Sequence, residues 1–355
     1  MADARLHGGI DARELARLGI ERASVLDLSV NVNPFGPHPA VAAAVAAASL
    51  ADYPDRTAST ARAALASALD CEPDRIAIGH GSVELLWALV AGLRREAKER
   101  PLLIVGPTFG EPEAAARAND IATVHVDMRE IDEFAVDAER IEAAIAQHAP
   151  GAVYLCQPNN PTGRALGSPE LQGLLQRQRG TRFILDQAFL SLSSVHAQHS
   201  LRVERLPHVV AVRSLTKDHA LAGLRVGYAL AAPELIQKLD AQRPPWMVST
   251  LAQAAVVAAV RHPEHVAQAR AWLLDARRQL TAAIGRLGLP VVPSETHYCL
   301  VRVGDADLVR ERVLRSHRLL VRSCRSFGLS QYIRVAAGTE EARARLVDAL
   351  AEHAR

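Results

Sequence analysis

The sequence predicts an α/β protein in which a large domain, with a mostly parallel sheet between helices, is followed by a small α+β domain. At 355 residues the chain is longer than one hydrophobic core usually supports, so two domains are expected. Short apolar runs alternate with helical patterns between residues 76 and 212, which is typical of parallel strands buried on both faces. The composition changes after Leu239, where Arg243-Pro-Pro-Trp-Met marks a boundary.

Charge and cysteine content exclude several classes of protein. Lysine and arginine total 41 against 39 aspartate and glutamate, so the formal net charge of +2 gives no reason to expect nucleic acid or a membrane as partner. The chain has no apolar run long enough to span a membrane, and its first residues lack the apolar part of a signal peptide, so we expect a soluble, cytoplasmic protein. The four cysteines are scattered, without Cys-x-x-Cys pairs or a histidine cluster, which favours free thiols and no metal.

The chain opens on His7-Gly8-Gly9, followed by a helical stretch and an extended segment over residues 25–37. Two glycines beside a histidine allow the backbone to approach a ligand closely. Asn31 and Asn33 lie on one side of the extended segment. Taken alone, these features are better explained as a turn and a strand end than as a ligand site. An alanine-rich helix is expected over 39–49, and a turn at Tyr53-Pro-Asp.

A glycine turn connects the next expected strand and helix. A helix is predicted over 60–69 and a strand over 76–78, which runs into Gly79 and Gly81 before Ser82 begins a helix through Leu93. A strand, a glycine turn and a helix N-terminus together form an anion site from backbone N–H groups and the helix dipole. A lone Gly-x-Gly is weak evidence, because every α/β fold contains such turns.

Polar and aromatic residues follow the strands of the predicted sheet. Strands are expected at 102–105, 122–126, 152–156, 183–186 and 209–212, and helices at 112–119, 138–147 and after residue 168. Phe109, Asn160, Asp186 and Lys217 come at the strand exits, where ligands bind in parallel sheets. Each has a structural alternative, namely core packing, a turn residue, a helix cap or a solvated lysine. Their joint occurrence favours a binding site.

Lys217 is the candidate nucleophile. It lies next to the hydroxyls of Ser214 and Thr216 and eight residues before Arg225. An amine beside donors for a dianion suits an aldehyde cofactor that carries a phosphate and is held as a Schiff base. We therefore interpret Lys217 as a pyridoxal phosphate lysine.

The last third of the chain predicts the small domain. Helices are expected over 250–260, 264–287, near 307–316 and from 340 to the end, with strands over 298–303, 319–322 and 332–336. We expect an N-terminal arm over 1–42 that packs with the small domain, a large cofactor domain over 43–243 and the small domain over 244–355.

Three motifs carry a family resemblance: Asn159-Asn-Pro-Thr-Gly163, Asp186-x-Ala-Phe189, and Ser214-x-Thr-Lys217 with Gly223-Leu-Arg225. Together they resemble the fold type I pyridoxal phosphate enzymes, in the branch that contains histidinol-phosphate aminotransferase and threonine-phosphate decarboxylase. Several stretches are more similar to the decarboxylase, namely residues 7–9, 29–37, 213–217, 244–246 with 251–255, 320–324 and 332–336. Histidinol-phosphate aminotransferases usually carry tyrosine in place of Phe189 and lack the His-Gly-Gly opening.

The resemblance implies a role for each matching residue. Lys217 would hold the cofactor and move protons, Asp186 would keep the pyridine nitrogen protonated, and Phe109 would stack on the ring. The expected phosphate ligands are Ser82, Val83, Ser214, Thr216 and Arg225, with Tyr53 from the other subunit of a homodimer. The expected substrate ligands are His7, Gly8, Asn31, Asn160, Arg322 and Arg334, with Asn160 also bonding the ring oxygen.

The chain departs from the family pattern at Gln187, usually Glu, at His297, usually Asn, and at Ile10, which is Asn in the decarboxylase pattern. These departures leave the cofactor set intact and bear on the substrate. The first expectation is decarboxylation of L-threonine O-3-phosphate to (R)-1-aminopropan-2-yl phosphate, in synthesis of the cobalamin side arm. The alternative is an aminotransferase of the histidinol-phosphate type that uses a 2-oxo acid. A third possibility is a non-catalytic member of the fold, which the intact lysine argues against.

Overall fold

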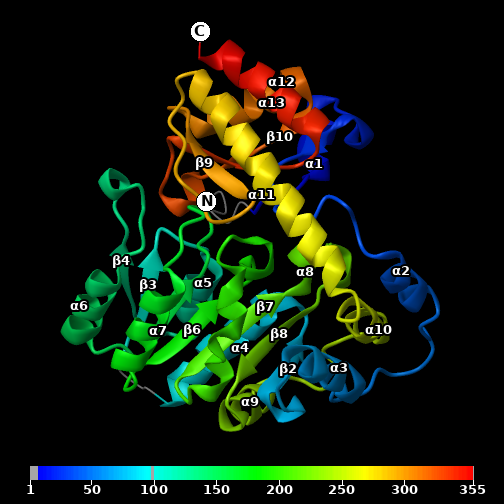
Figure 1. The fold of residues 1–355 in the computed structure, drawn as a ribbon, viewed down its shortest axis with the longest axis vertical. Helices are drawn as coiled ribbons and strands as arrows, with labels where there is room; N and C mark the ends of the chain where they lie inside the picture. The colour runs from blue at the N-terminus through cyan, green and yellow to red at the C-terminus, as the bar shows by residue number, and fades with distance from the viewer. Residues whose placement is uncertain (1–6, 97–99, 355) are drawn as a thin grey trace.

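The computed structural model describes residues 7–96 and 100–354. A large sheet with its helices forms one unit, a smaller sheet with its helices forms the other, and the long helix α11 (Pro263–Arg286) runs between them (Figure 1). No helix of the described residues is long and apolar enough to cross a membrane.

The large unit is built on a seven-stranded sheet, and the expected mostly parallel α/β arrangement is confirmed. In spatial order the strands are β2 (Ile76–Gly79), β8 (Gly227–Ala231), β7 (Val209–Ser214), β6 (Arg182–Asp186), β5 (Ala152–Cys156), β3 (Leu102–Gly106) and β4 (Thr123–Asp127). Strand β8 is antiparallel to both of its neighbours. The sequence analysis missed β8, because this strand follows the Lys217 motif without the crossover helix that marks the parallel strands.

Helices cover both faces of this sheet, and the side chains of each strand alternate between them. On β3, Leu102 and Ile104 pack in one core while Leu103 and Val105 pack in the other. The first core includes α4 (Gly81–Glu96), α5 (Glu111–Ala118) and α9 (Pro233–Asp240). The second includes α3 (Ser59–Leu69), α6 (Ala138–His148), α7 (Ser168–Arg177) and α10 (Thr250–Ala259). The sheet is thereby buried on both sides, and its strand ends are left to form a site.

The smaller unit is an antiparallel sheet under helices, joined by the N-terminal segment. Its sheet has the order β11 (Arg322–Ser323), β12 (Tyr332–Ala336) and β9 (Tyr298–Arg302), and its helices are α12 (Ala306–His317), α13 (Glu340–His353) and the second half of α11. The segment before the large unit pairs β1 (Leu26–Asp27) with β10 (Leu319–Leu320) and packs α1 (Ala12–Leu18) against α12. Of the extended segment expected over 25–37, only these two residues form a strand.

The junction between the two units lies close to α11. Helix α10 packs against α2 (Pro39–Ala46) and α3, so Val248, Ala252 and Val256 belong to the core of the large unit. Leu273, in the first half of α11, packs against Leu192 of the large unit, while the second half enters the small-unit core. We therefore propose a junction within α11 in place of the boundary expected at residue 243, with α2 assigned to the large unit.

A histidine group lies at the N-termini of α2 and α11. Ligand atoms of His38, His262 and Glu264 lie within 4.8 Å of one another, which the sequence analysis did not anticipate because His38 is remote in the chain. The rings of His38 and His262 stack at 3.8 Å with 17° between their planes. Stacked rings direct their nitrogen lone pairs in parallel and not toward one point, so this geometry is that of a packing contact.

The four cysteines are free thiols.

Gly227 is a position at which a single methyl group should disturb both the sheet and the site beneath it. A Cβ there would lie 2.7 Å from the carbonyl oxygen of Arg213 and 2.8 Å from the backbone nitrogen of Ser82. Neither backbone atom can move away freely, so we expect Gly227→Ala to cost about 1–3 kcal/mol of unfolding free energy through overpacking.

The measurement is the midpoint of thermal unfolding, with Gly285→Ala in α11 as the matched control. A Cβ at Gly285 meets nothing within 4 Å, so the control should keep or slightly raise the midpoint through better helix propensity. Equal midpoints for the two variants would contradict the close approach at Gly227.

Candidate active site

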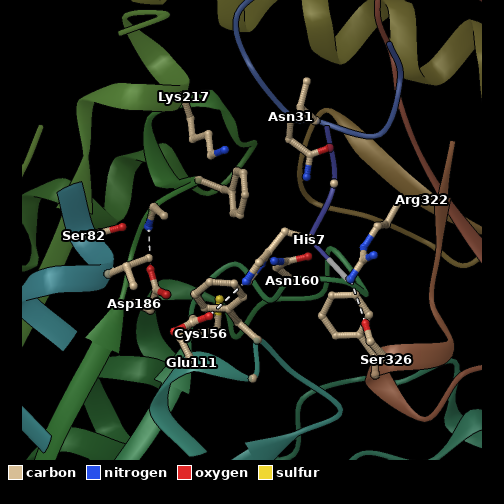
Figure 2. Close-up of a pocket in the computed structure, with 18 of the residues that line it drawn as sticks. His7, Asn31, Ser82, Glu111, Cys156, Asn160, Asp186, Lys217, Arg322 and Ser326 are labelled. Atoms are coloured by element: carbon tan, nitrogen blue, oxygen red, sulfur yellow. Dashed lines mark hydrogen bonds and ion pairs between the residues drawn. The ribbon is translucent and has the colours of Figure 1, made fainter. Parts of the chain in front are cut away.

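A cavity of about 570 Å³ opens at the carboxyl ends of the parallel strands, between the large sheet and the smaller unit (Figure 2). All but two of the residues predicted from the sequence line it: His7, Gly8, Asn31, Ser82, Val83, Phe109, Asn160, Asp186, Thr216, Lys217, Arg225, Arg322 and Arg334. Residues from three parts of the chain therefore meet in one cavity.

Lys217 lies on a single helical turn directly after β7. This turn, α8 (Leu215–Asp218), is capped by the Ser214 hydroxyl, which accepts a hydrogen bond from the backbone nitrogen of Thr216 at 3.3 Å. Burial, with the positive charges of Arg334 and Arg225, lowers the pKa of the Lys217 amine to about 8. A much larger fraction of this amine is therefore neutral and nucleophilic near neutral pH than for an exposed lysine.

Asp186 ends the neighbouring strand β6 and receives two hydrogen bonds. Its Oδ1 accepts from the backbone nitrogen of Ala188 at 3.1 Å, and its Oδ2 accepts from the hydroxyl of Tyr154 at 2.9 Å. Burial raises the pKa of this carboxyl, and the two hydrogen bonds act in the opposite direction. The sequence analysis missed Tyr154, although a tyrosine in the middle of an otherwise apolar buried strand is a signal that a hydroxyl has a partner there.

The N-terminus of α4 and Arg225 form a cationic end of the cavity. Gly81 has a positive φ of 79°, and a Cβ on it would lie 2.8 Å from Nη2 of Arg225. This glycine therefore allows the guanidinium to lie against the first turn of the helix. Ser82 and Val83, in the first turn of α4, also line the cavity, as does Thr216 of α8. Backbone N–H groups, a helix dipole and a guanidinium together favour a dianion.

Two arginines from the small sheet occupy the opposite wall. Arg322 and Arg334 are direct partners in the register of β11 and β12, and both are buried. Arg334 donates to Oδ1 of Asn160 and, at 2.6 Å, to the carbonyl oxygen of Ser29, while Arg322 donates to the hydroxyl of Ser326 at 2.7 Å. No carboxylate of the described residues forms an ion pair with either guanidinium. Their charges are therefore available to an anionic ligand.

Burial affects the charged state of the arginines themselves. Burial and the adjacent charge of Arg334 lower the pKa of Arg322 to about 10. Burial likewise lowers the pKa of Arg334. Arg322 therefore remains protonated near neutral pH, and an added anion would stabilise the charged form of both guanidinium groups.

The N-terminal segment forms a third wall and is anchored beside the lysine. The backbone nitrogen of Asn33 donates to the carbonyl oxygen of Lys217 at 2.9 Å, and its side chain donates to the carbonyl oxygen of Asp218 at 3.0 Å. Asn31, which is 1% exposed, lines the cavity, and neither atom of its amide has a partner among the described residues. Asn33 therefore anchors the segment, and Asn31 presents its amide to the cavity (Figure 2).

His7 lies at the mouth of the cavity in a chain of contacts that the sequence analysis missed. Its Nε2 is 3.0 Å from Oε1 of Glu111 (Figure 2). The other carboxylate oxygen of Glu111, Oε2, accepts from the indole nitrogen of Trp87 at 2.7 Å. Gly8 is required beside it, because a Cβ there would lie 2.5 Å from the carbonyl oxygen of Ser29. Glu111 begins α5 two residues after the expected aromatic residue Phe109, but only the folded chain brings it to His7.

Two predicted residues do not line the cavity. The Ser214 hydroxyl is 2.6 Å from the hydroxyl of Thr216 and is buried behind it, so its contact with the cavity is indirect. Tyr53 is 83% exposed and packs its ring 5.4 Å from that of Trp246. Within one chain Tyr53 is therefore outside the site.

The three departures from the family pattern also lie outside the cavity lining. Gln187 accepts a hydrogen bond from Nε of Arg213 at 2.9 Å, and both side chains are buried. His297 is fully buried with its ring 6.1 Å from that of Phe189, and burial lowers its pKa to about 4. Ile10 packs in the small cluster around α1. These residues therefore act on a ligand only through their neighbours.

Comparison with known proteins identifies the family. Residues 23–350 match the family described as aminotransferase class I and II. The chain belongs to this family. A curated histidinol-phosphate aminotransferase of Symbiobacterium thermophilum is 36% identical over 330 residues, which cover 92% of this chain and 90% of the relative. One of Gluconacetobacter diazotrophicus is 32% identical over 335 residues, covering 92% and 91%.

Solved structures confirm the type I fold of this chain. Histidinol-phosphate aminotransferase of Sinorhizobium meliloti, solved in complex with pyridoxal-5'-phosphate, has a TM-score of 0.88 at 24% identity and covers 100% of this chain and 97% of its own. L-threonine-O-3-phosphate decarboxylase of Porphyromonas gingivalis has a TM-score of 0.80 at 25% identity and covers 92% of this chain and 98% of its own. The curated relatives therefore favour the aminotransferase alternative over the decarboxylase that the motifs suggested.

The donor set fits the family's cofactor. Pyridoxal phosphate needs an amine for its aldehyde, an anion for its pyridine nitrogen and donors for its phosphate. The cavity holds the amine of Lys217, the carboxylate of Asp186 and the cationic end around Arg225.

The lowered pKa of Lys217 predicts how the apoenzyme captures its cofactor. The neutral amine is the nucleophile, so the rate of covalent capture should rise with pH and reach half its plateau near the amine pKa of about 8. An ordinary lysine would place the midpoint about two units higher. The adduct can be trapped with borohydride and quantified by mass spectrometry. Lys217→Ala should form no adduct, and a midpoint near that of free lysine would contradict the electrostatic account.

Proposed function

We propose that this protein is an aminotransferase of the histidinol-phosphate type, which transfers the amino group of a phosphorylated amine to a 2-oxo acid. The observation that carries the proposal is the near full-length similarity, at 36% and 32% identity, to curated proteins with that name. The cavity supports the proposal with two buried arginines that have no carboxylate partner among the residues described.

The proposed catalytic roles follow from position in the cavity. Bound pyridoxal phosphate would supply an electron sink for negative charge at the substrate Cα. Lys217 would hold the cofactor through its amine and then, as the neutral base, take the proton from Cα. Asp186 would hold the pyridine nitrogen, Asn160 would donate its amide nitrogen to the ring oxygen, and Phe109 would cover one ring face. The proposed phosphate ligands are the N-terminus of α4, Thr216 and Arg225.

The proposed substrate ligands are Arg322, Arg334, Asn31, His7 and Gly8. The arginines can bind the phosphate of the amine in one half-reaction and the carboxylates of the oxo acid in the other. Asn31 supports this role because its amide is buried, unpartnered within the described chain and directed into the cavity. Orientation decides the reaction, since the bond at Cα that stands perpendicular to the cofactor ring is the one that breaks.

Decarboxylation of a phosphorylated amino acid is the second candidate. Phe189 lines the cavity in place of the family's tyrosine, and the His7-Gly8 pair of the decarboxylase-like opening also lines it. In this case the arginines would hold the side-chain phosphate so that the carboxylate, and not the hydrogen, stands perpendicular.

The two candidates are separated by one pair of reactions with the holoenzyme. Histidinol phosphate carries no carboxylate on Cα, so it can be deaminated but not decarboxylated. When it is added to the holoenzyme, we expect the absorbance of the cofactor to change to that of the pyridoxamine form. Addition of 2-oxoglutarate should then restore the original absorbance. With O-phospho-L-threonine and no oxo acid we expect no catalytic release of CO2. Catalytic CO2 release, with no response to histidinol phosphate, would replace the aminotransferase proposal by the decarboxylase.

Arg322 should control affinity for the phosphorylated amine. Arg322→Gln keeps a hydrogen-bond donor and removes the charge, so we expect KM for histidinol phosphate to rise roughly 10- to 100-fold, since a charged hydrogen bond contributes about 1.5–3 kcal/mol. The value of kcat should change less. Arg325→Gln is the matched control, because Arg325 is 58% exposed and pairs with Asp307 at the surface. An equal KM in both variants would remove Arg322 from the substrate site.

We also propose a homodimer in which Tyr53 completes the phosphate site of the partner. Its support is three exposed apolar side chains, Leu50, Tyr53 and Trp246, which are 83%, 83% and 48% exposed, and of which Tyr53 and Trp246 pack ring to ring at 5.4 Å.

Mixed dimers test this arrangement. Lys217→Ala and Tyr53→Ala chains should each be impaired, but a mixed dimer would hold one site with both native residues. We therefore expect activity to return when the two variants are unfolded and refolded together, and not when they are refolded apart. A monomer in light scattering, or no recovery in the mixture, would contradict the shared site.

A further inference from the structure

We propose that Tyr154 is a positioning residue of the reaction, which holds Asp186 through a hydrogen bond so that the carboxylate faces the cavity as an anion. This inference rests on the cofactor of the family and not on the choice of substrate. Its test therefore uses the cofactor alone, so that it can fail while the histidinol-phosphate proposal stands, and the reverse.

The geometry connects two neighbouring strands beneath the cavity. Tyr154 lies on β5 and Asp186 on β6, and the register places Cys156, not Tyr154, directly opposite Asp186. The tyrosine is thus a diagonal neighbour, at a distance that an aromatic side chain can span. Its hydroxyl donates to Oδ2 of Asp186 at 2.9 Å, and the two residues are 0% and 3% exposed.

The closer neighbour does not make this bond. The thiol of Cys156 donates to the carbonyl oxygen of Pro158 at 3.3 Å. Oδ1 of Asp186 accepts from the backbone nitrogen of Ala188. Each carboxylate oxygen therefore has one donor among the described residues, and further lone pairs remain for a ligand.

The hydroxyl is a permanent donor. Burial, with the nearby negative charge of Asp186, raises the pKa of Tyr154 well above its ordinary value, so the phenol stays protonated throughout the working range. A protonated phenol beside an ionised carboxylate can only donate. The hydrogen bond from Tyr154 therefore stabilises the ionised form of Asp186.

Asp186 needs this support because of where it lies. Burial raises its pKa, and the Tyr154 hydroxyl is the first of the influences that lower it, before Ala188 and Lys217. A protonated carboxyl can no longer pair with a protonated pyridine nitrogen. Loss of the phenol hydrogen bond should therefore raise the pKa of Asp186. The interaction of Asp186 with the pyridine nitrogen of the cofactor should become weaker as a result.

Tyr154→Phe removes the hydroxyl and keeps the ring. We expect cofactor affinity to fall roughly 10- to 100-fold, the equivalent of one buried hydrogen bond to a charged group. The decrease should be larger toward acidic pH, because more of Asp186 is then protonated. The decisive readout is the 15N chemical shift of cofactor labelled at the pyridine nitrogen, which should move toward the value of the unprotonated ring and lie between those of the wild type and Asp186→Asn.

Tyr332→Phe is the matched control. Tyr332 also donates to a carboxylate, Oε1 of Glu130 at 2.6 Å, but neither residue lines the cavity. The Tyr332→Phe variant should lose a tyrosine–carboxylate hydrogen bond without any change in the 15N shift of the cofactor or in the pH dependence of cofactor affinity.

A second variant guards against a loss of folding in Tyr154→Phe. Site-specific 3-fluorotyrosine at position 154 keeps the hydroxyl and makes it more acidic, so it should strengthen the donation and move the acid limb of cofactor binding to lower pH. If both variants at position 154 show the 15N shift and the pH dependence of cofactor affinity of the wild type, the proposal is wrong.

Discussion

The buried guanidinium of Arg334 joins three parts of the chain. It lies on β12 of the smaller unit, donates to Asn160 at an exit of the large sheet, and donates to the carbonyl oxygen of Ser29 in the N-terminal segment. Both acceptors are neutral, so the contacts fix the geometry without neutralising the charge. A buried cation without an anionic partner is costly in free energy, so the site around Arg334 favours binding of an anionic ligand.

The same excess of positive charge sets the chemistry of Lys217. Arg334 and Arg225 oppose protonation of its amine and act together with burial. The carboxylate of Asp186 is the main compensating charge, but it too is buried and its pKa is raised. Burial therefore moves both groups toward their neutral forms before any ligand binds. Dianionic ligands would relieve the imbalance, which is consistent with the proposed binding of phosphate and carboxylate groups in this cavity.

The sequence predicted the parts of the site that depend on local order along the chain. Strand exits at Asn160, Asp186 and Lys217 were visible because parallel sheets place their ligands there. Tyr154 and Glu111 were not, because their roles depend on a diagonal strand contact and on where the N-terminal segment folds back. The packing of α10 on α2 joins segments about 200 residues apart, which no local pattern encodes. Function was the least predictable level, since the motifs resembled a decarboxylase whereas the curated relatives are aminotransferases.

Two of the departures from the family pattern bear on substrate choice only indirectly. Gln187 bonds Arg213 within the core, and His297 lies behind Phe189, so a substrate in the cavity touches neither. Phe189 itself does line the cavity, and it cannot donate a hydrogen bond where a tyrosine would. Oδ1 of Asn160 accepts from Arg334, so in the proposed function only its amide N–H group is left to donate to the ring oxygen. One amide would then connect the proposed cofactor side of the site to the proposed substrate arginine, and we expect discrimination between substrates to depend on that contact.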